Sequence, residues 1–289
     1  MRKRIMALCL LLAVLPFAAA AEAPVSYTYR KVQDGTSYVS DTLRYSIEVA
    51  KIDRTKVYVT RVWMQDPGRQ IRKAVSPWHK HLAKPEALAA KIPEAALAIN
   101  GSGYVSPLYP WIPDEYPGES EDYYFTPLGS LTILDGELLR RLDGVPYTGL
   151  TLQADGLHMH IAEDNADVLA ASPTQTWAFY DKCPLILNGE SILDRSWEFA
   201  NDMAIRTIIA KIDEHNYVIL TVTSAHGLTL PTCTDFLLSE FHPEWAFNLD
   251  GGTSGALIRR KHGKKKQVLI YGSRQMVVDV MAFTELPAQ

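Results

Sequence analysis

The chain has 289 residues, of which 47% are hydrophobic and 21% are charged, and its formal net charge is −4. This composition is that of a folded globular protein, which excludes a disordered chain and permits one large domain or two small ones. A mildly acidic surface also argues against nucleic acid or anionic membranes as partners, so we expect no nucleic-acid binding.

Residues 1–23 differ from the rest and form a candidate signal peptide. Arg2, Lys3 and Arg4 precede an apolar run over residues 5–17, and small residues suited to cleavage follow. The run is too short for a comfortable membrane span. We therefore expect export to the periplasm or the medium, and no stable membrane span after cleavage. An uncleaved N-terminal anchor is the alternative.

Two cysteines, Cys183 and Cys233, remain after cleavage of the signal peptide. An oxidising compartment permits a disulfide between them. Two separate buried thiols are an equally good interpretation, because free cysteine is among the most buried residue types. The sequence leaves both interpretations open.

Strands are the commonest predicted element, because short apolar runs alternate with polar residues and turn residues. The first hairpin turn is expected at Asp34-Gly35. The predicted strands in chain order are 27–33, 37–49, 56–64, 95–99, 128–134, 137–142, 149–152, 157–162, 176–180, 184–187, 205–212, 217–223, 245–249, 268–271 and 276–283.

Two segments have helical character. Residues 78–91 carry leucines and alanines at helical spacing, with Pro85 marking a break or a second start. Residues 231–241 are the clearer helix, with Thr232 as the expected N-cap. Many strands with few helices predict an α+β fold, in which a mostly antiparallel or mixed sheet carries a few packed helices in a single domain.

A long loop over residues 106–127 is rich in proline and tyrosine. Loops of this length are usually functional or disordered, and the aromatic content argues against disorder. Sugar rings present apolar C–H faces on which aromatic side chains pack, so the loop is a candidate lid over a carbohydrate. A loop anchored by its own aromatic residues is the alternative.

Residues 246–258 are the most informative stretch. An apolar run ends at Asp250, two glycines and two hydroxyl residues follow, and a third glycine leads into another apolar run. Glycine allows close approach of a ligand to the backbone, and consecutive N–H groups in such a turn form an anion-binding concavity. The alternative is an ordinary Asp-Gly hairpin turn, although two glycines and two hydroxyls exceed what a turn needs.

Residues 248–254, with the sequence Asn-Leu-Asp-Gly-Gly-Thr-Ser, resemble the Asn-Leu-Asp-Gly-Gly-Gly-Ser signature of the phosphodiester glycosidase family. The chain departs from that family at Thr253, which replaces the third glycine, and at Ser102, which alters the block around Asn100. We therefore divide the chain into a signal peptide (1–23), an N-terminal β-rich segment (24–94) and a phosphodiester glycosidase-like domain (95–289). The other blocks that match in order are 98–101, 127–129 with 135–136, 184–189, 206–207, 227–230 and 274.

The resemblance implies an exported hydrolase that cleaves a sugar-1-phosphodiester or a related glycosidic bond in envelope glycans. The alternative is a non-catalytic glycan-binding or envelope polysaccharide assembly protein. Cleavage at C1 develops positive charge that a carboxylate stabilises or attacks, whereas guanidinium groups suit the phosphate. The candidate catalytic residues are Asp250, Arg206 and Arg274. The candidate substrate-binding residues are Asn100, Thr207, Asn248, Gly251, Gly252 and Ser254.

We expect no cofactor, and a carbohydrate or sugar phosphate as the partner. The pairs His79/His81 and His158/His160 have a spacing that places both rings on one side of a strand, but neither has a third metal ligand close in sequence, so we predict no metal site. The basic run over 259–266 is interpreted as a solvated hairpin loop, with contact to an anionic glycan as the alternative.

Overall fold

The computed structural model describes residues 24–108, 110, 116–223, 226–261, 267–272 and 275–287. Every pairing between its strands is antiparallel. The strands are β1 (Tyr29–Val39), β2 (Leu43–Ile52), β3 (Thr55–Met64), β4 (Ile71–Val75), β5 (Ala95–Asn100), β6 (Leu131–Leu134), β7 (Glu137–Arg141), β8 (Tyr147–Gln153), β9 (Gly156–Glu163), β10 (Gln175–Trp177), β11 (Pro184–Leu187), β12 (Glu190–Ser191), β13 (Thr207–Lys211), β14 (Asn216–Val222), β15 (Trp245–Asn248), β16 (Ala256–Arg260), β17 (Gln267–Gly272) and β18 (Asp279–Thr284).

The helices are short, with one exception at α5. Few helices among antiparallel strands confirm the predicted α+β class. The helices are α1 (Pro67–Gln70), α2 (Pro85–Ala89), α3 (Asn165–Ala170), α4 (Glu198–Asn201) and α5 (Leu230–Phe241), with 3₁₀ turns η1 (Ser120–Tyr123) and η2 (Gly252–Ser254).

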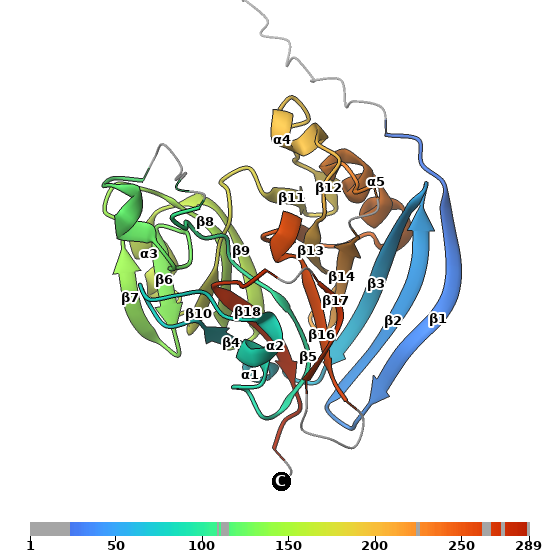
Figure 1. Cartoon of the computed structure of the whole chain (residues 1–289), viewed down its shortest axis with the longest axis horizontal. Helices are drawn as coiled ribbons and strands as arrows, with labels where there is room; N and C mark the ends of the chain where they lie inside the picture. Colours follow the sequence, from blue (N-terminus) through green and yellow to red (C-terminus); the bar gives the residue numbers. More distant parts are fainter. Residues whose placement is uncertain are drawn as a thin grey trace, which may run out of the picture.

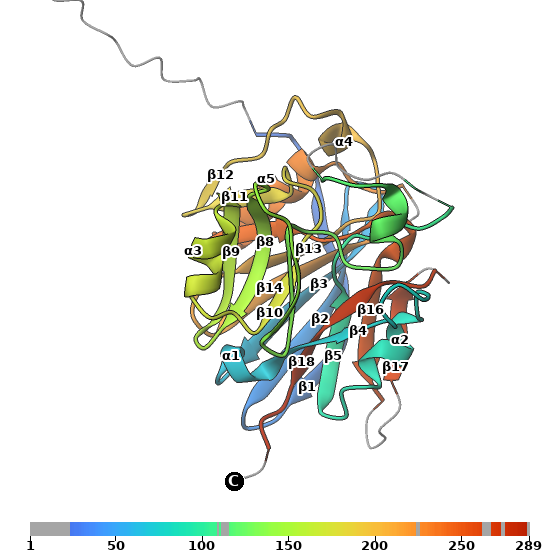
Figure 2. The ribbon, with the colours of Figure 1, turned by 90° about the vertical axis from the view of Figure 1, so that its left-hand side faces the viewer.

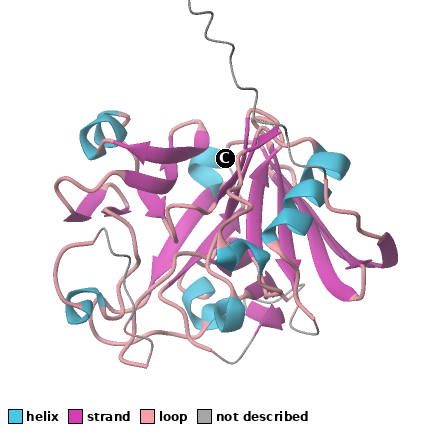
Figure 3. Ribbon diagram, turned by 90° about the horizontal axis from the view of Figure 1, so that it is seen from above, coloured by secondary structure: helices cyan, strands magenta, loops and turns pink. Residues whose placement is uncertain are grey.

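Two sheets form the body of the molecule (Figure 1). The larger sheet has the order β1-β2-β3-β14-β13-β15-β11-β12, and the smaller has the order β17-β16-β5-β18-β4. The strands β10-β8-β9 and the hairpin β6-β7 form a lobe with α3, at the left of Figure 1. In the view from above, strands and loops make up most of the molecule (Figure 3).

The central strands of the larger sheet are buried on both faces. Ile209 and Phe247 pack toward the smaller sheet, in a core shared with Ile99. Ile208 and Ala246 pack on the opposite face, toward α5. Because both faces are covered, these strands read as continuous apolar runs rather than strict alternation. The helix α2 covers the far face of the smaller sheet, so α2 and α5 lie on opposite sides of the molecule (Figure 2).

The N-terminal segment shares both sheets with the rest of the chain. Residues 57–63 of β3 pair with the whole of β14, which adds β1 and β2 to the larger sheet. The strand β4 pairs with β18 at the edge of the smaller sheet. Residues before Ala95 therefore help to build the frame on which the later strands lie.

One sequence-based prediction in this segment was wrong, and a second was right only in part. The strand β1 continues through Asp34-Gly35 with register shifts, and the chain reverses instead near Ser40, whose N–H donates to the Leu43 carbonyl at 2.9 Å. A bulge absorbs the Asp-Gly pair, because such bulges accept an extra residue without ending the strand.

The predicted helix over residues 78–91 is reduced to α2. Lys84, before Pro85, has an extended backbone with ψ of 135°. The proline ring disfavours helical angles at the preceding residue, so the helix begins only at Pro85. Ala83 instead pairs with Val277 as an isolated bridge.

The helix α5 begins one turn earlier than the expected cap. Thr229, not Thr232, is the N-cap, and its hydroxyl accepts a hydrogen bond from the Thr232 N–H at 3.2 Å. Pro231 lies in the first turn, where the missing N–H costs nothing. The helix ends at His242, which adopts the left-handed conformation with φ of 48°.

Cys183 and Cys233 are free, buried thiols, so the structure favours separate thiols over a disulfide. Burial raises the pKa of each thiol to about 12, which makes them packing residues rather than nucleophiles. Among the described residues, no helix has the length and apolar character needed to cross a bilayer.

Candidate active site

Asp250 lies where the chain crosses from one sheet to the other. The strand β15 belongs to the larger sheet and β16 to the smaller one, and Asp250 and η2 connect them. The Leu249 N–H donates to the Thr207 carbonyl at 2.8 Å, and the Asp250 N–H donates to the Gly101 carbonyl at 3.1 Å. The corner at Asp250 is therefore tied to both sheets by its main chain.

Glycine is favoured at positions 251 and 252 for two different structural reasons. A Cβ atom on Gly251 would lie 2.5 Å from the Ile205 carbonyl oxygen, so only glycine fits against that backbone. Gly252 has open space around it but a φ of +54°, which favours glycine. Both N–H groups are used inside the protein: Gly251 donates to the Asp250 carboxyl at 2.8 Å, and Gly252 donates to the Ile205 carbonyl at 3.0 Å.

The Asn100 side chain joins the corner to three elements. Its Nδ2 donates to the Asp250 carbonyl at 2.6 Å, and its Oδ1 accepts from the Thr207 hydroxyl at 2.8 Å and from the Ala256 N–H at 2.9 Å. Asn100 and Thr207 are fully buried. Their polar groups are thus engaged with each other and with the main chain beneath the corner.

The Asp250 carboxyl group is partly buried and has an elevated proton affinity. Burial raises its pKa from 3.8 to about 7, with a smaller contribution from the charge of Asp279. Hydrogen bonds from the Ser254 hydroxyl and the Gly251 N–H oppose this shift. A carboxyl group that titrates near neutral pH in a cavity is a candidate catalytic group.

A cavity of about 280 Å³ opens at the corner. It combines the Asp250 carboxyl group, the Arg206 guanidinium group and aromatic rings, together with the backbone of the glycine turn. The lining residues are Tyr104, Phe179, Tyr180, Phe199, Ala204, Ile205, Arg206, Asp250, Gly251, Gly252, Thr253, Ser254 and Gln275.

Arg206 is held rigidly at the start of β13. Its Nη2 donates to the Phe199 and Asp202 carbonyls at 2.8 Å each, and its Nε donates to the Leu228 carbonyl at 3.4 Å. The guanidinium group stacks on the Phe199 ring at 4.4 Å. Burial lowers the pKa of Arg206, and the charge of Asp202 opposes this shift only in part. An anionic ligand in the cavity would add to that compensation.

Aromatic side chains form one wall of the cavity. The Tyr180 ring packs against Phe179 at 4.1 Å, Phe199 at 5.2 Å and Trp197 at 5.7 Å between centroids. Burial and the charge of Asp250 raise the pKa of Tyr180 to about 12, so its hydroxyl stays protonated. These rings are not among the predicted site residues. Phe179 and Tyr180 lie at the end of a predicted strand and belong to no recognisable motif.

The structure brings together part of the predicted site. Asp250, Arg206, Gly251, Gly252 and Ser254 line the cavity. Asn100, Thr207 and Asn248 lie beneath it, all fully buried. Asn248 donates from Nδ2 to the Cys183 sulfur at 3.6 Å. Arg274 lies outside the described residues.

The two departures from the family signature lie at different depths. Thr253 is exposed and lines the cavity, so its side chain occupies the mouth where the family has glycine. Ser102 is buried and does not line the cavity; its N–H donates to the Asp279 carboxylate at 2.7 Å. Of the two, only Thr253 is positioned to meet a ligand directly.

The described part of the 106–127 loop is held by its own aromatic residues. Tyr116 stacks on Tyr123 with a centroid distance of 5.8 Å, and the Arg140 guanidinium lies 5.4 Å from the Tyr123 ring. Neither tyrosine lines the cavity. The described residues thus favour the anchored-loop interpretation, and Tyr109 and residues 111–115 lie outside the described part.

A larger cavity, of about 650 Å³, lies along β4 and the β6-β7 hairpin. Several of its charged groups already have protein partners. The Lys91 ammonium donates to the Val75 carbonyl at 2.9 Å, and Glu285 pairs with Arg260 at 2.7 Å. We therefore place the candidate active site at Asp250, where a titratable carboxyl group meets a buried cation.

The His158/His160 pair has partners close in the chain. His158 contacts Asp155 at 2.7 Å, and His160 contacts both Glu163 at 2.6 Å and Thr151 at 2.8 Å. Among the described residues, no group of three metal-ligating side chains is close enough to hold an ion.

Comparison with known proteins agrees with the resemblance. The family model for phosphodiester glycosidases matches residues 94–283. The zebrafish N-acetylglucosamine-1-phosphodiester alpha-N-acetylglucosaminidase catalytic domain, auto-inhibited by its pro-peptide, has a similar structure (TM-score 0.63, 17% identity, 91% of this chain and 89% of that chain). A hypothetical protein from Synechocystis is also similar (TM-score 0.50, 13% identity, 85% and 63%). Among curated protein sequences, none matches significantly. At these identities, the solved structures establish the fold alone.

The raised pKa of Asp250 predicts a pH-dependent stability difference for Asp250→Asn. A carboxyl group with a pKa of about 7 when folded and 3.8 as a model value binds its proton more tightly in the native state. The wild type therefore loses stability relative to the variant as pH rises from about 4 to about 7. We expect the variant to gain about 1–3 kcal/mol relative to the wild type between pH 5 and pH 8, measured by urea unfolding.

Asp167→Asn is the control, because Asp167 is exposed on α3. Its effect is expected to stay within about 0.5 kcal/mol at both pH values. An equal stability difference for Asp250→Asn at pH 5 and pH 8 would show that the Asp250 carboxyl group titrates normally.

Proposed function

Because this chain belongs to the phosphodiester glycosidase family, we propose that it is a hydrolase that releases a sugar from a sugar-1-phosphodiester or a related glycosidic bond in envelope glycans. One observation carries the proposal: a carboxyl group of raised pKa and a guanidinium group that forms no salt bridge with any described residue line the same aromatic cavity. A sugar phosphodiester has the complementary groups, namely an apolar ring face, an electrophilic C1 and an anionic phosphate.

In the proposed reaction, the ionised Asp250 carboxylate acts at C1. Positive charge develops there as the C1–O bond breaks, and a nearby carboxylate stabilises it or forms a covalent bond with it. The departing phosphomonoester is already a good leaving group, so it needs a cation more than a general acid. Water completes the hydrolysis. The rate is then expected to rise with pH as the carboxyl group ionises, with a midpoint near its pKa of about 7.

Arg206 is the proposed phosphate clamp. Its Nε and Nη2 are engaged with main-chain carbonyls, which leaves Nη1 without a hydrogen-bond partner among the described residues. The three hydrogen bonds fix the guanidinium plane before a ligand arrives, so little entropy is lost on binding. Arg274 stays a proposed second clamp on the grounds of the sequence alone.

The remaining predicted binding residues have supporting roles in this proposal. Asn100 and Thr207 hold the Asp250 main chain from below, and Asn248 anchors the end of β15. Gly251 and Gly252 shape the turn, and the Ser254 hydroxyl orients the Asp250 carboxyl group. We propose that sugar hydroxyls are met instead by groups at the mouth of the cavity, such as Gln275.

A non-catalytic glycan-binding protein is the second candidate. The exposed Thr253 side chain at the cavity mouth favours it, because added volume there obstructs a substrate that fits the family's glycine. A glycan-binding protein of this kind would retain the cavity and bind sugar phosphodiesters without product release.

Asp250→Asn is expected to lower kcat by at least about 10³-fold on a panel of sugar-1-phosphodiesters, because it removes the charge that acts at C1. Binding measured by calorimetry should persist within about threefold, since the amide is isosteric. Sugar release is followed by chromatography. Tight binding of the panel by wild-type protein with no product would favour the glycan-binding alternative, and undiminished turnover in the variant would remove Asp250 from the mechanism.

Tyr180→Ala is expected to raise KM about tenfold with a smaller change in kcat, because a sugar face loses its stacking surface of about 1–1.5 kcal/mol. Tyr180→Phe is the matched control, which keeps the ring and should retain wild-type KM within about twofold. If the phenylalanine variant behaves like the alanine variant, the hydroxyl matters and the stacking role is wrong.

We propose that the protein is exported by the candidate signal peptide, which lies outside the described residues. Intact mass spectrometry of the protein from the periplasm or medium should show a chain shortened by cleavage within the small-residue segment 18–23 at the end of the candidate signal peptide. A full-length chain recovered with the membrane fraction would support an N-terminal anchor instead.

A further inference from the structure

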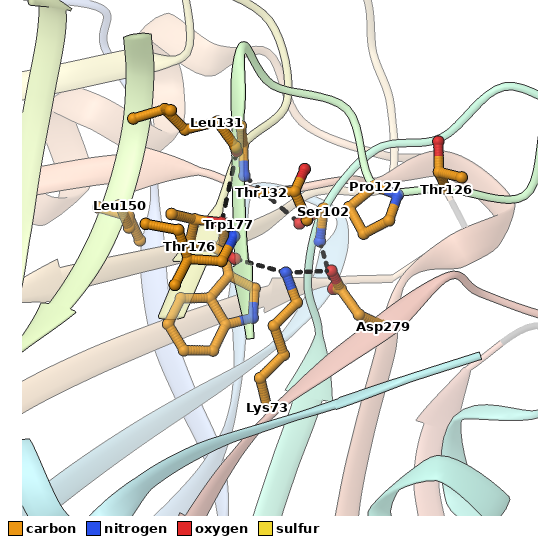
Figure 4. A network of polar contacts seen from close by, with 12 residues as sticks. Lys73, Ser102, Thr126, Pro127, Leu131, Thr132, Leu150, Thr176, Trp177 and Asp279 are labelled. Atoms are coloured by element: carbon orange, nitrogen blue, oxygen red, sulfur yellow. Dashed lines mark hydrogen bonds and ion pairs between the residues drawn. The ribbon is translucent and has the colours of Figure 1, made fainter. Parts of the chain in front are cut away.

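A fully buried ion pair joins Lys73 on β4 to Asp279 on β18 (Figure 4). The Lys73 Nζ on β4 is 2.9 Å from Oδ2 of Asp279 on β18, and both side chains have 0% exposure. The ammonium group also donates to the Thr176 carbonyl and lies 5.4 Å from the Trp177 ring centroid. Placing two charges out of water carries a desolvation cost that the attraction between them does not always recover. A buried pair of this kind is therefore expected to have a structural role beyond its own attraction.

Asp279 contacts the turn that supports Asp250. Its Oδ1 accepts a hydrogen bond from the Ser102 N–H at 2.7 Å, and its main-chain carbonyl accepts from the Gly101 N–H at 3.2 Å. The Gly101 carbonyl in turn accepts from the Asp250 N–H at 3.1 Å. A continuous series of short contacts thus runs from Lys73 through Asp279 and the 101–102 turn to Asp250.

The turn is packed closely against this pair. A Cβ atom on Gly101 would lie 2.0 Å from Oδ1 of Asp279 and 2.7 Å from Cδ1 of Trp177. Gly101 therefore permits the approach of the Asp279 carboxylate to the backbone. The Asn-Gly pair of this block has two separate functions: Asn100 holds the Asp250 carbonyl, and Gly101 admits Asp279.

We propose that the buried Lys73–Asp279 pair positions the Asp250 corner, with Asp279 fixing the Gly101–Ser102 backbone and Lys73 supplying the counter-charge. Neither residue lines the cavity at Asp250, so they are positioning residues. This inference rests on the proposed function for its catalytic consequence, but its structural part stands on the contacts alone. Lys73 also lies outside residues 94–283, where the family model matches.

The pair also acts on Asp250 through charge. The Asp279 charge adds to the effect of burial in raising the pKa of Asp250. Other charged or titratable groups near Asp250 are Arg206, Tyr180 and Tyr104, which line the same cavity. Arg140 and Tyr147 interact with the buried pair from the β6–β8 side.

Asparagine at position 279 separates charge from hydrogen bonding. In Asp279→Asn, the side-chain oxygen still accepts from the Ser102 N–H, but the negative charge is gone and Lys73 is left uncompensated. Loss of the Asp279 charge lowers the pKa of Asp250. Asp279→Leu removes the charge and the hydrogen bond together.

The first measurement is a ¹³C NMR titration of the Asp250 carboxyl group, identified by its loss in Asp250→Asn. Asp279→Asn should lower the midpoint by about one pH unit. The control is Asp235→Asn, because Asp235 is also a buried carboxylate, paired with Arg195 on the α5 side of the larger sheet. The control should leave the midpoint unchanged. Equal midpoints in Asp279→Asn and the control would overturn the electrostatic part.

The second measurement is hydrogen exchange at the Asp250 amide, which reports the hydrogen bond to Gly101. Asp279→Leu should speed this exchange by about tenfold or more, whereas Asp279→Asn should change it less than about threefold. Asp235→Asn corrects for a general loss of stability. If Asp279→Leu fails to fold, Lys73→Met with Asp279→Asn removes both charges and keeps the acceptor, and it should retain slow exchange. Fast exchange in Asp279→Asn and in the Lys73→Met/Asp279→Asn double variant would overturn the positioning role.

Turnover separates this inference from the proposed function. On an active substrate, Asp279→Asn should move the pH midpoint of kcat/KM downward by the same amount as the NMR titration. If the wild type turns over no sugar phosphodiester, the proposed function fails. The titration and exchange measurements still decide whether the pair positions Asp250.

Discussion

The site depends on the three hydrogen bonds that the side-chain amide of Asn100 forms. Asn100 lies at the end of β5 in the smaller sheet, and it binds Thr207 of the larger sheet, the Ala256 N–H and the Asp250 carbonyl. The bonds to Thr207 and Ala256 are buried, where an unmade hydrogen bond carries a large desolvation penalty, and the bond to Asp250 is partly buried. The two sheets therefore meet in one register at this point, and the acidic corner is built on that register.

The corner places opposite charges where water is scarce. Burial raises the pKa of Asp250 and lowers that of Arg206, so the cavity destabilises the ionised form of both groups. Such a site favours a ligand with its own charge distribution, because the ligand replaces the missing solvent. Desolvation that weakens folding at this corner is the same property that makes Asp250 titrate near neutral pH.

The sequence predicted the α+β class, the family and the polar corner, because these depend on local patterns. The Asp-Gly-Gly run is recognisable in the sequence because the local backbone favours glycine: Gly251 approaches another main chain closely, and Gly252 has a positive φ. The aromatic wall was not predictable in this way. Tyr180, in a loop, and Phe199, on α4, reach the cavity only through tertiary packing, and no spacing in the sequence encodes that contact. The late start of the helix predicted over residues 78–91 followed from one proline, Pro85, whose effect on its neighbour outweighed the helical pattern.

The frame of the site extends beyond the family motif. Residues 94–283 carry the signature, yet β3 lies against β14 and β4 lies against β18, so strands from outside that range complete both sheets. Lys73 on β4 shows the consequence for the site, because this residue from outside the matched range gives the Asp279 carboxylate an ion-pair partner in the interior. A strand that only covered an edge would have no need to bury an ammonium group there. The charges near Asp250 therefore depend on strands from both parts of the chain. The seven-residue motif at 248–254 contains neither Lys73 nor Asp279.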